Sequence, residues 1–107
     1  MRSFVLAASS LAVMTCTDPL FAQSLEENFD SCINGAGKIA NEEIVAACSN
    51  LIDQAQAENE TVGFFYAMRA TASTDRERNC ADGLKAKILI SDPKLADPIE
   101  QIISQNC

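Results

Sequence analysis

The sequence predicts an all-α fold of about five short helices, arranged in antiparallel hairpins and stapled by two disulfides. Three observations lead to this fold class. Helix-start motifs recur along the chain, no stretch of useful length alternates apolar and polar residues with the period of a strand, and an even set of cysteines is left once a predicted export segment is removed. The connections between the expected helices are short, which favours antiparallel packing of neighbours.

Residues 1–22 have the three regions of a signal peptide. Arg2 is followed by an apolar run, and the small residue Ala22 stands before the expected cut. The apolar run is shorter than the roughly 20 residues that a membrane-spanning helix needs. We therefore expect a periplasmic or secreted protein whose mature part, residues 23–107, is a single helical disulfide-bonded domain without stable membrane insertion.

Lipidation at Cys16 is an alternative way of processing the same segment, as in bacterial lipoproteins. Thr15 precedes this cysteine, whereas such signals carry Gly or Ala there. Ordinary cleavage and lipidation both leave four cysteines for disulfide bonds, so cysteine parity does not separate them.

The first two helices of the mature chain have clear start signals. Ser24-Leu25-Glu26-Glu27 is a capping box, and the helix that it begins should stop near Gly35 or Gly37. Asn41 is the expected cap of the second helix, because acidic residues follow it and suit the first turn. One face of this second helix has the spacing of a buried stripe, made of Ile44, Ala47, Cys48, Leu51 and Ala55.

A third helix, from about Glu60 to Ala72, holds three of the four aromatic residues of the mature chain. It carries Val62, Phe65 and Met68, and Phe65 is expected in the core. Three consecutive aromatic residues cannot all lie on one side of a helix. At least one of Phe64, Phe65 and Tyr66 should therefore point outward or toward a partner.

The fourth and fifth helices follow two further start signals. Thr74-Asp75-Arg76-Glu77 is a second capping box, after which Cys80, Leu84 and Ile88 repeat every four residues. Ser91-Asp92-Pro93 ends that helix. In the fifth, Asp97 is the expected cap and Pro98 the first helical residue. The apolar residues expected to face inward are Ile99, Ile102 and Ile103.

Helix geometry selects one pairing of the four mature cysteines. Two residues of an antiparallel hairpin face each other when they are equally far from the turn. The midpoint of Cys32 and Cys48 is residue 40, and that of Cys80 and Cys107 is 93.5, so both midpoints fall on turn-forming residues. The sequence therefore predicts the bonds Cys32–Cys48 and Cys80–Cys107, each worth roughly 3 kcal/mol.

Metal binding and thiol catalysis are weaker explanations of these cysteines. Zinc sites usually pair their ligands a few residues apart, and this chain has neither that spacing nor a histidine. The missing histidine also removes the usual base that activates a catalytic thiol. We expect no bound metal, no cofactor and no enzymatic activity.

The net charge of −7 limits the kinds of partner that the chain can bind. An acidic chain without a cluster of basic residues is poorly suited to nucleic acid or to an anionic membrane surface. The charge therefore argues against both of these kinds of partner.

Three stretches resemble exported bacterial tetratricopeptide-repeat (TPR) proteins. They are Asp30-Ser31-Cys32-Ile33-Asn34-Gly35, Ile44–Ile52 with the sequence IVAACSNLI, and Phe65–Ala70 with the sequence FYAMRA. Ser91–Asp97 is similar to the turn between repeats of that family. The resemblance implies one or two degenerate TPR-like units, since Ala70 stands where the family has Gly and Lys85 where it has an aromatic residue.

The TPR resemblance implies a concave surface for a peptide or protein and brings no catalytic residues with it. Arg69 falls in a groove-lining helix of the family, and with Tyr66 and Phe64 it forms the candidate partner-binding set. Arg69 paired with a nearby acid is the plainer interpretation. We expect a small non-enzymatic binding module, with two alternatives: an exported inhibitor or immunity-like protein that blocks an enzyme, and an accessory subunit completed only in a complex.

Overall fold

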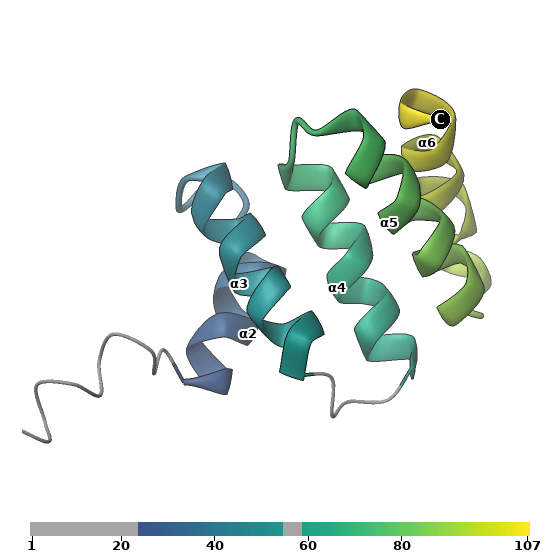
Figure 1. Ribbon diagram of the computed structural model, residues 1–107. Coiled ribbons are helices and arrows are strands. Elements are labelled where there is room, and N and C mark those ends of the chain that lie inside the picture. The colour runs from purple at the N-terminus through teal and green to yellow at the C-terminus, as the bar shows by residue number, and fades with distance from the viewer. Residues whose placement is uncertain (1–23, 55–58) are drawn as a thin grey trace, which may run out of the picture.

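The computed structural model describes residues 24–54 and 59–107, which form an all-α fold, as the sequence predicts (Figure 1). Within these residues there are five α-helices, one 3₁₀ turn and no strand. The predicted signal peptide, its cleavage after Ala22, the alternative anchor at Cys16 and the predicted core residue Ala55 lie outside the described residues. The helices are α2 (Leu25–Asn34), α3 (Asn41–Gln54), α4 (Asn59–Ala72), α5 (Arg76–Leu89) and α6 (Ala96–Asn106), with the 3₁₀ turn η1 (Pro93–Leu95) before α6.

Helix α4 lies at the centre of the arrangement (Figure 1). Each helix packs against the next one in the chain, and α4 also contacts α2 and α6. Helices α3 and α5 therefore lie on two sides of α4 and reach each other only through it. None of the described helices is long and apolar enough to cross a bilayer.

The predicted start of α2 is confirmed. The Ser24 hydroxyl accepts a hydrogen bond from the Glu27 N–H at 3.1 Å, and the Glu27 carboxylate accepts one from the Ser24 N–H at 3.2 Å. The helix ends at Asn34, and Gly37 supplies the positive φ of 80° that the following turn requires.

The caps of α3, α5 and α6 differ from the predicted ones by one or two residues. Asn41 is already helical, and the carboxylate of Glu43 accepts a hydrogen bond from the Ala40 N–H before it. Asp75 rather than Thr74 caps α5, because its carboxylate accepts from the Arg78 N–H at 3.2 Å. Helix α6 begins at Ala96, so the predicted cap Asp97 lies in the first turn; Asp92 instead caps the 3₁₀ turn.

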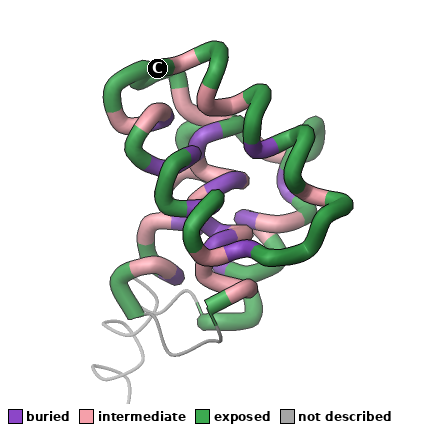
Figure 2. Tube along the Cα trace, turned by 90° about the vertical axis from the view of Figure 1, so that its right-hand side faces the viewer, coloured by how far each residue is buried: buried purple, intermediate pink, exposed green. Residues whose placement is uncertain are grey.

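Two apolar clusters form the core, one on each side of the molecule's centre. The buried residues run through the interior of the helical stack, with exposed ones outside them (Figure 2). Phe29 packs edge-on against Phe65 with ring centroids 5.9 Å apart. The first cluster contains Cys32, Ile44, Ala47, Cys48, Leu51 and Phe65, and the second contains Ala67, Ala86, Ile90 and Ile99.

Both predicted disulfides are confirmed. Cys32–Cys48 links α2 to α3 with the Cα atoms 4.9 Å apart, and Cys80–Cys107 links α5 to the residue after α6 with the Cα atoms 5.0 Å apart. Each bond spans a helical hairpin, as the midpoint argument requires. Cys32 and Cys48 are completely buried, whereas Cys107 is exposed.

Two glycines allow close approach of helices, and sequence reasoning did not identify them as packing residues. A Cβ on Gly63 of α4 would lie 2.9 Å from the Leu89 Cβ of α5. A Cβ on Gly83 of α5 would lie 2.9 Å from the Ile102 Cγ2 of α6. Both glycines are buried, so they set the spacing of α4, α5 and α6.

Helix α5 has an unusual distribution of polar and apolar residues. Its inward side is made of polar and small residues, whereas Leu84 and Ile88 are 46% and 79% exposed. The predicted repeat of Cys80, Leu84 and Ile88 therefore does not form a core stripe. The inward residues are Asn79, Asp82, Gly83 and Ala86.

Candidate binding surface

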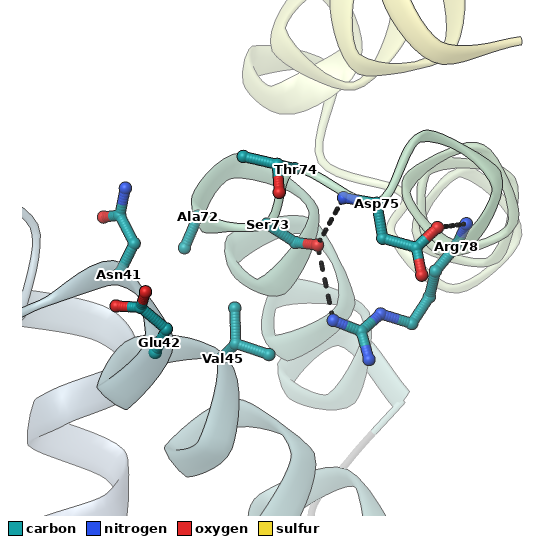
Figure 3. A pocket seen from close by; sticks show the side chains of 8 residues that line it. All are labelled: Asn41, Glu42, Val45, Ala72, Ser73, Thr74, Asp75 and Arg78. Carbon is teal, nitrogen blue, oxygen red and sulfur yellow. Dashed lines mark hydrogen bonds between the residues drawn. The ribbon is translucent and has the colours of Figure 1, made fainter.

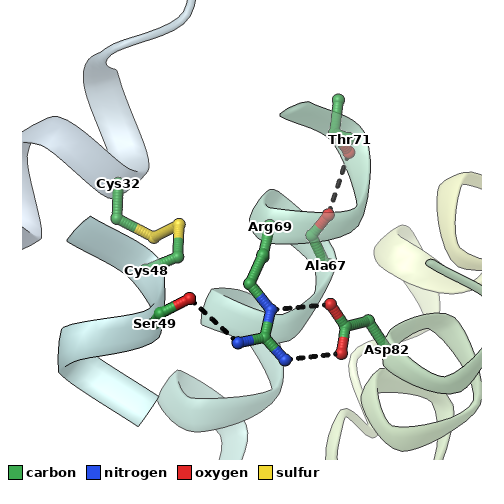
Figure 4. The surroundings of a disulfide bond; sticks show 7 residues. All are labelled: Cys32, Cys48, Ser49, Ala67, Arg69, Thr71 and Asp82. Atoms are coloured by element: carbon green, nitrogen blue, oxygen red, sulfur yellow. Dashed lines mark hydrogen bonds and ion pairs between the residues drawn. A yellow bond between two sulfur atoms is a disulfide. The ribbon is translucent and has the colours of Figure 1, made fainter. Parts of the chain in front are cut away.

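Arg69 connects three helices through its guanidinium group (Figure 4). From α4, its Nε and Nη2 donate to the two carboxylate oxygens of Asp82 on α5 at 2.8 and 2.9 Å. Its Nη1 donates to the Ser49 hydroxyl on α3 at 3.0 Å. This bidentate geometry is the strong form of an arginine–carboxylate pair.

The Arg69–Asp82 pair is largely shielded from water. The side chains are 14% and 3% exposed. The hydrogen bond to Asp82 raises the pKa of Arg69 above its ordinary value, and burial opposes this increase only partly. The pair is thus more buried than a typical surface ion pair, and the Arg69 guanidinium is bonded to residues of its own chain.

The candidate set Arg69, Tyr66 and Phe64 is only partly brought together. The Tyr66 ring centroid lies 5.6 Å from the Arg69 guanidinium carbon, and Tyr66 also packs against the second core cluster. Phe64 is half-buried. It precedes Tyr66 by two residues on the same helix, so the two side chains lie on different sides of α4. Phe65 is buried, as predicted. A partner-binding role for the set stays a prediction.

A hollow of about 460 Å³ lies between the start of α3 and the α4–α5 connection (Figure 3). The Ser73 hydroxyl accepts hydrogen bonds there from the Asp75 N–H at 3.1 Å and from Arg78 Nη2 at 3.3 Å. Arg78 and the acidic Glu42 both line it. Charged groups of both signs line this hollow, so its charge favours neither an anion nor a cation.

A second hollow, of about 410 Å³, lies between the end of α4 and α6. Its polar side chains are uncharged. Asn79 donates to the Ser73 carbonyl at 2.7 Å, and Asn106 donates to the Ile102 carbonyl at 2.8 Å. These carboxamides bind the chain's own backbone. Across residues 24–54 and 59–107, no group of three or more His, Cys, Asp or Glu side chains is placed to hold a metal ion.

The outward side of α5 carries two of the four large apolar residues that are exposed in the described part of the chain; the other two, Leu25 and Phe29, lie on α2. We call Ala81, Leu84 and Ile88 the α5 ridge; all three are exposed. Lys85 and Lys87 are exposed beside it. Sequence reasoning noted the four-residue spacing of the two large apolar residues, but their exposure depends on which side of α5 its neighbours cover.

Charge is unevenly distributed over the described helices. Helices α2 and α3 carry six acidic residues and no basic one, whereas α5 carries four basic residues and two acidic ones. Since Asp82 of α5 is paired inside with Arg69, the exposed side of α5 is basic on an acidic protein. The acidic residues of α2 and α3 are Glu26, Glu27, Asp30, Glu42, Glu43 and Asp53.

The TPR resemblance stays a prediction after comparison with known proteins. The chain matches no described protein family, no curated protein and no solved structure at a significant level.

Proposed function

We propose that this chain is a small exported helical module that binds a protein or peptide in the bacterial periplasm and has no enzymatic activity. The α5 ridge is the observation that carries the proposal. A small protein gains stability by burying its large aliphatic residues. Here Leu84 and Ile88 point outward while Asn79 and Asp82 of the same helix are buried. Apolar residues that lie next to one another on an exposed surface are typical of an interaction site.

The ridge is held in place by contacts on both sides of α5. Arg69 fixes Asp82 from the α4 side, and the Cys80–Cys107 bond fixes the α6 side. A surface that is already ordered loses less conformational entropy on binding. This rigidity supports a binding role.

The two disulfides support the proposed compartment. Such bonds form and persist in oxidising environments, including the bacterial periplasm. The signal-peptide pattern of residues 1–22 agrees with export.

An exported inhibitor that blocks an enzyme is the second candidate. The acidic residues of α2 and α3 favour it, because a surface of one charge sign attracts an oppositely charged active-site rim. In that case the acidic helices, rather than α5, would contact the partner.

Affinity capture tests the proposed function. The exported chain, with both disulfides intact, is immobilised and exposed to an extract of the bacterial envelope; a reduced and alkylated sample is the matched control. We expect one protein to be retained only by the folded chain, and to bind it again when both are purified. Recovery of no such protein under several salt conditions would contradict the proposal.

A further inference from the structure

We propose that the α5 ridge is the docking surface for an acidic amphipathic helix of the partner protein. This inference rests on the proposed binding function and adds the site and the chemistry of the partner. The occupant is argued from the shape of the ridge and from the charges beside it.

The ridge has the spacing of a helix-binding surface. Ala81, Leu84 and Ile88 are separated by three and four residues, so they lie along one side of α5. The opposite side packs on α4 and α6 through residues that include Asp82 and Ala86. An apolar row of this kind complements the apolar stripe of a second helix, which would bury Leu84 and Ile88 together.

Lysines on both sides of the ridge select the charge of the partner. Lys85 and Lys87 fall on opposite sides of the line from Leu84 to Ile88 when α5 is viewed along its axis. Lys87 pairs with Glu100 of α6 at 2.7 Å, but both side chains are more than half exposed. Such a pair is weak and can be exchanged for a partner's carboxylate.

The other exposed charges of α5 indicate where along the helix the partner's carboxylates should lie. Arg76 and Glu77 lie at the start of the helix, whereas the lysines lie in its second half. The carboxylates of the bound helix should therefore concentrate beside the second half of α5. A basic partner helix would instead meet Lys85 and Lys87 as like charges.

Two synthetic peptides of about 18 residues, long enough to form isolated helices, provide the test. Both carry leucines at helical spacing; glutamates flank the leucines in one and lysines in the other. The oxidised full exported chain is titrated with each peptide at low and high salt. We expect saturable binding of the acidic peptide, weakened by salt, and at least tenfold weaker binding of the basic peptide.

Two variants locate the binding. Leu84→Ser with Ile88→Ser should weaken the acidic peptide roughly tenfold or more, because two aliphatic side chains no longer become buried. Leu25→Ser on α2, which removes another exposed aliphatic side chain, is the matched control and should leave binding unchanged. Lys85→Glu with Lys87→Glu should reverse the preference, so that the basic peptide binds better. Circular dichroism checks that all variants fold.

The inference is overturned if neither peptide binds, if both bind equally, or if the charge reversal leaves the preference unchanged. Affinity capture from the envelope extract with the Leu84→Ser/Ile88→Ser variant distinguishes a failure of the α5 docking surface from a failure of the proposed binding function. A partner still retained by this variant would leave the binding function standing and remove α5 as its site. A wild-type chain that retains nothing would refute the binding function itself.

Discussion

Arg69 of α4 is hydrogen-bonded to both α3 and α5. Its guanidinium donates to Asp82 twice and to Ser49 once. Removing one partner of a buried pair leaves the other charge without compensation, which costs more than the pair itself contributes. The residue that seemed most suited to a ligand from the sequence thus has a clear structural role.

Asp82→Ala should lower the free energy of unfolding by about 3 kcal/mol, because it leaves the Arg69 guanidinium buried beside a small apolar residue. Urea unfolding followed by circular dichroism measures the change. Lys87→Met, which breaks the exposed pair with Glu100, is the control and should cost less than about 1 kcal/mol. Equal effects of the two substitutions would show that the internal pair has no special role.

The contribution of Arg69 should be independent of pH between about pH 6 and pH 9, because an arginine keeps its charge throughout this range. The pKa of Arg69 is raised on folding, so its contribution is fully present below the unfolded-state pKa and is lost only when pH rises through the folded-state pKa. Urea unfolding of wild type and Arg69→Met across the range gives the difference. A difference that shrinks toward pH 9 would contradict this assignment.

The packing of α4 against α5 depends on Gly63. Alanine usually favours a helix over glycine by up to about 1 kcal/mol. At position 63, however, a methyl group would lie 2.9 Å from the Leu89 Cβ, which cannot rotate away because it is bonded to the backbone. The clash between the new methyl group and α5 is therefore expected to outweigh the higher helix propensity of alanine.

Gly63→Ala should accordingly destabilise the protein by about 1–3 kcal/mol, the usual cost of overpacking. Urea unfolding provides the measurement. Asn50→Ala, at an exposed position of α3, is the control and should not destabilise the protein, because alanine is the better helix former and no neighbour is crowded there. A stabilised Gly63→Ala variant would mean that α4 and α5 are farther apart than described.

Sequence reasoning identified the helices well because their start signals are local. It placed Thr74 rather than Asp75 at the start of α5, since neighbouring residues can both accept the first free N–H groups. It could not determine which side of α5 is buried, because that depends on Arg69 and α6. The exposure of Leu84 and the burial of Asp82 both follow from these contacts between helices.

The two disulfides should differ in their ease of reduction. Cys32 and Cys48 are inaccessible to solvent, whereas Cys107 is exposed beyond the end of α6. Thiol–disulfide exchange requires access of the attacking thiolate to a sulfur atom. Limited treatment with dithiothreitol, followed by alkylation and mass spectrometry, should label Cys80 and Cys107 first. Earlier labelling of Cys32 and Cys48 would contradict the described burial.

At the scale of the whole molecule, two cross-linked hairpins pack on either side of α4, each with its own apolar cluster. A chain of this size buries a limited fraction of its surface, and disulfides commonly supplement such cores. The positions of the disulfides could be predicted because each one joins two consecutive helices across the connection between them. The contrast in charge between α5 and the acidic α2 and α3 is present in the sequence, and the internal pairing of Asp82 makes the exposed side of α5 more basic still.

The orientation of α5 underlies both the binding role and the proposed docking surface. Hydroxyl-radical footprinting of the free chain, read by mass spectrometry, measures this orientation with pairs of chemically identical residues. Leu84 should be oxidised much faster than Leu51, which is 6% exposed, and Ile88 much faster than Ile99, which is 4% exposed. Equal rates within the pairs would show that the apolar residues of α5 face the core, and would contradict the binding surface proposed for it.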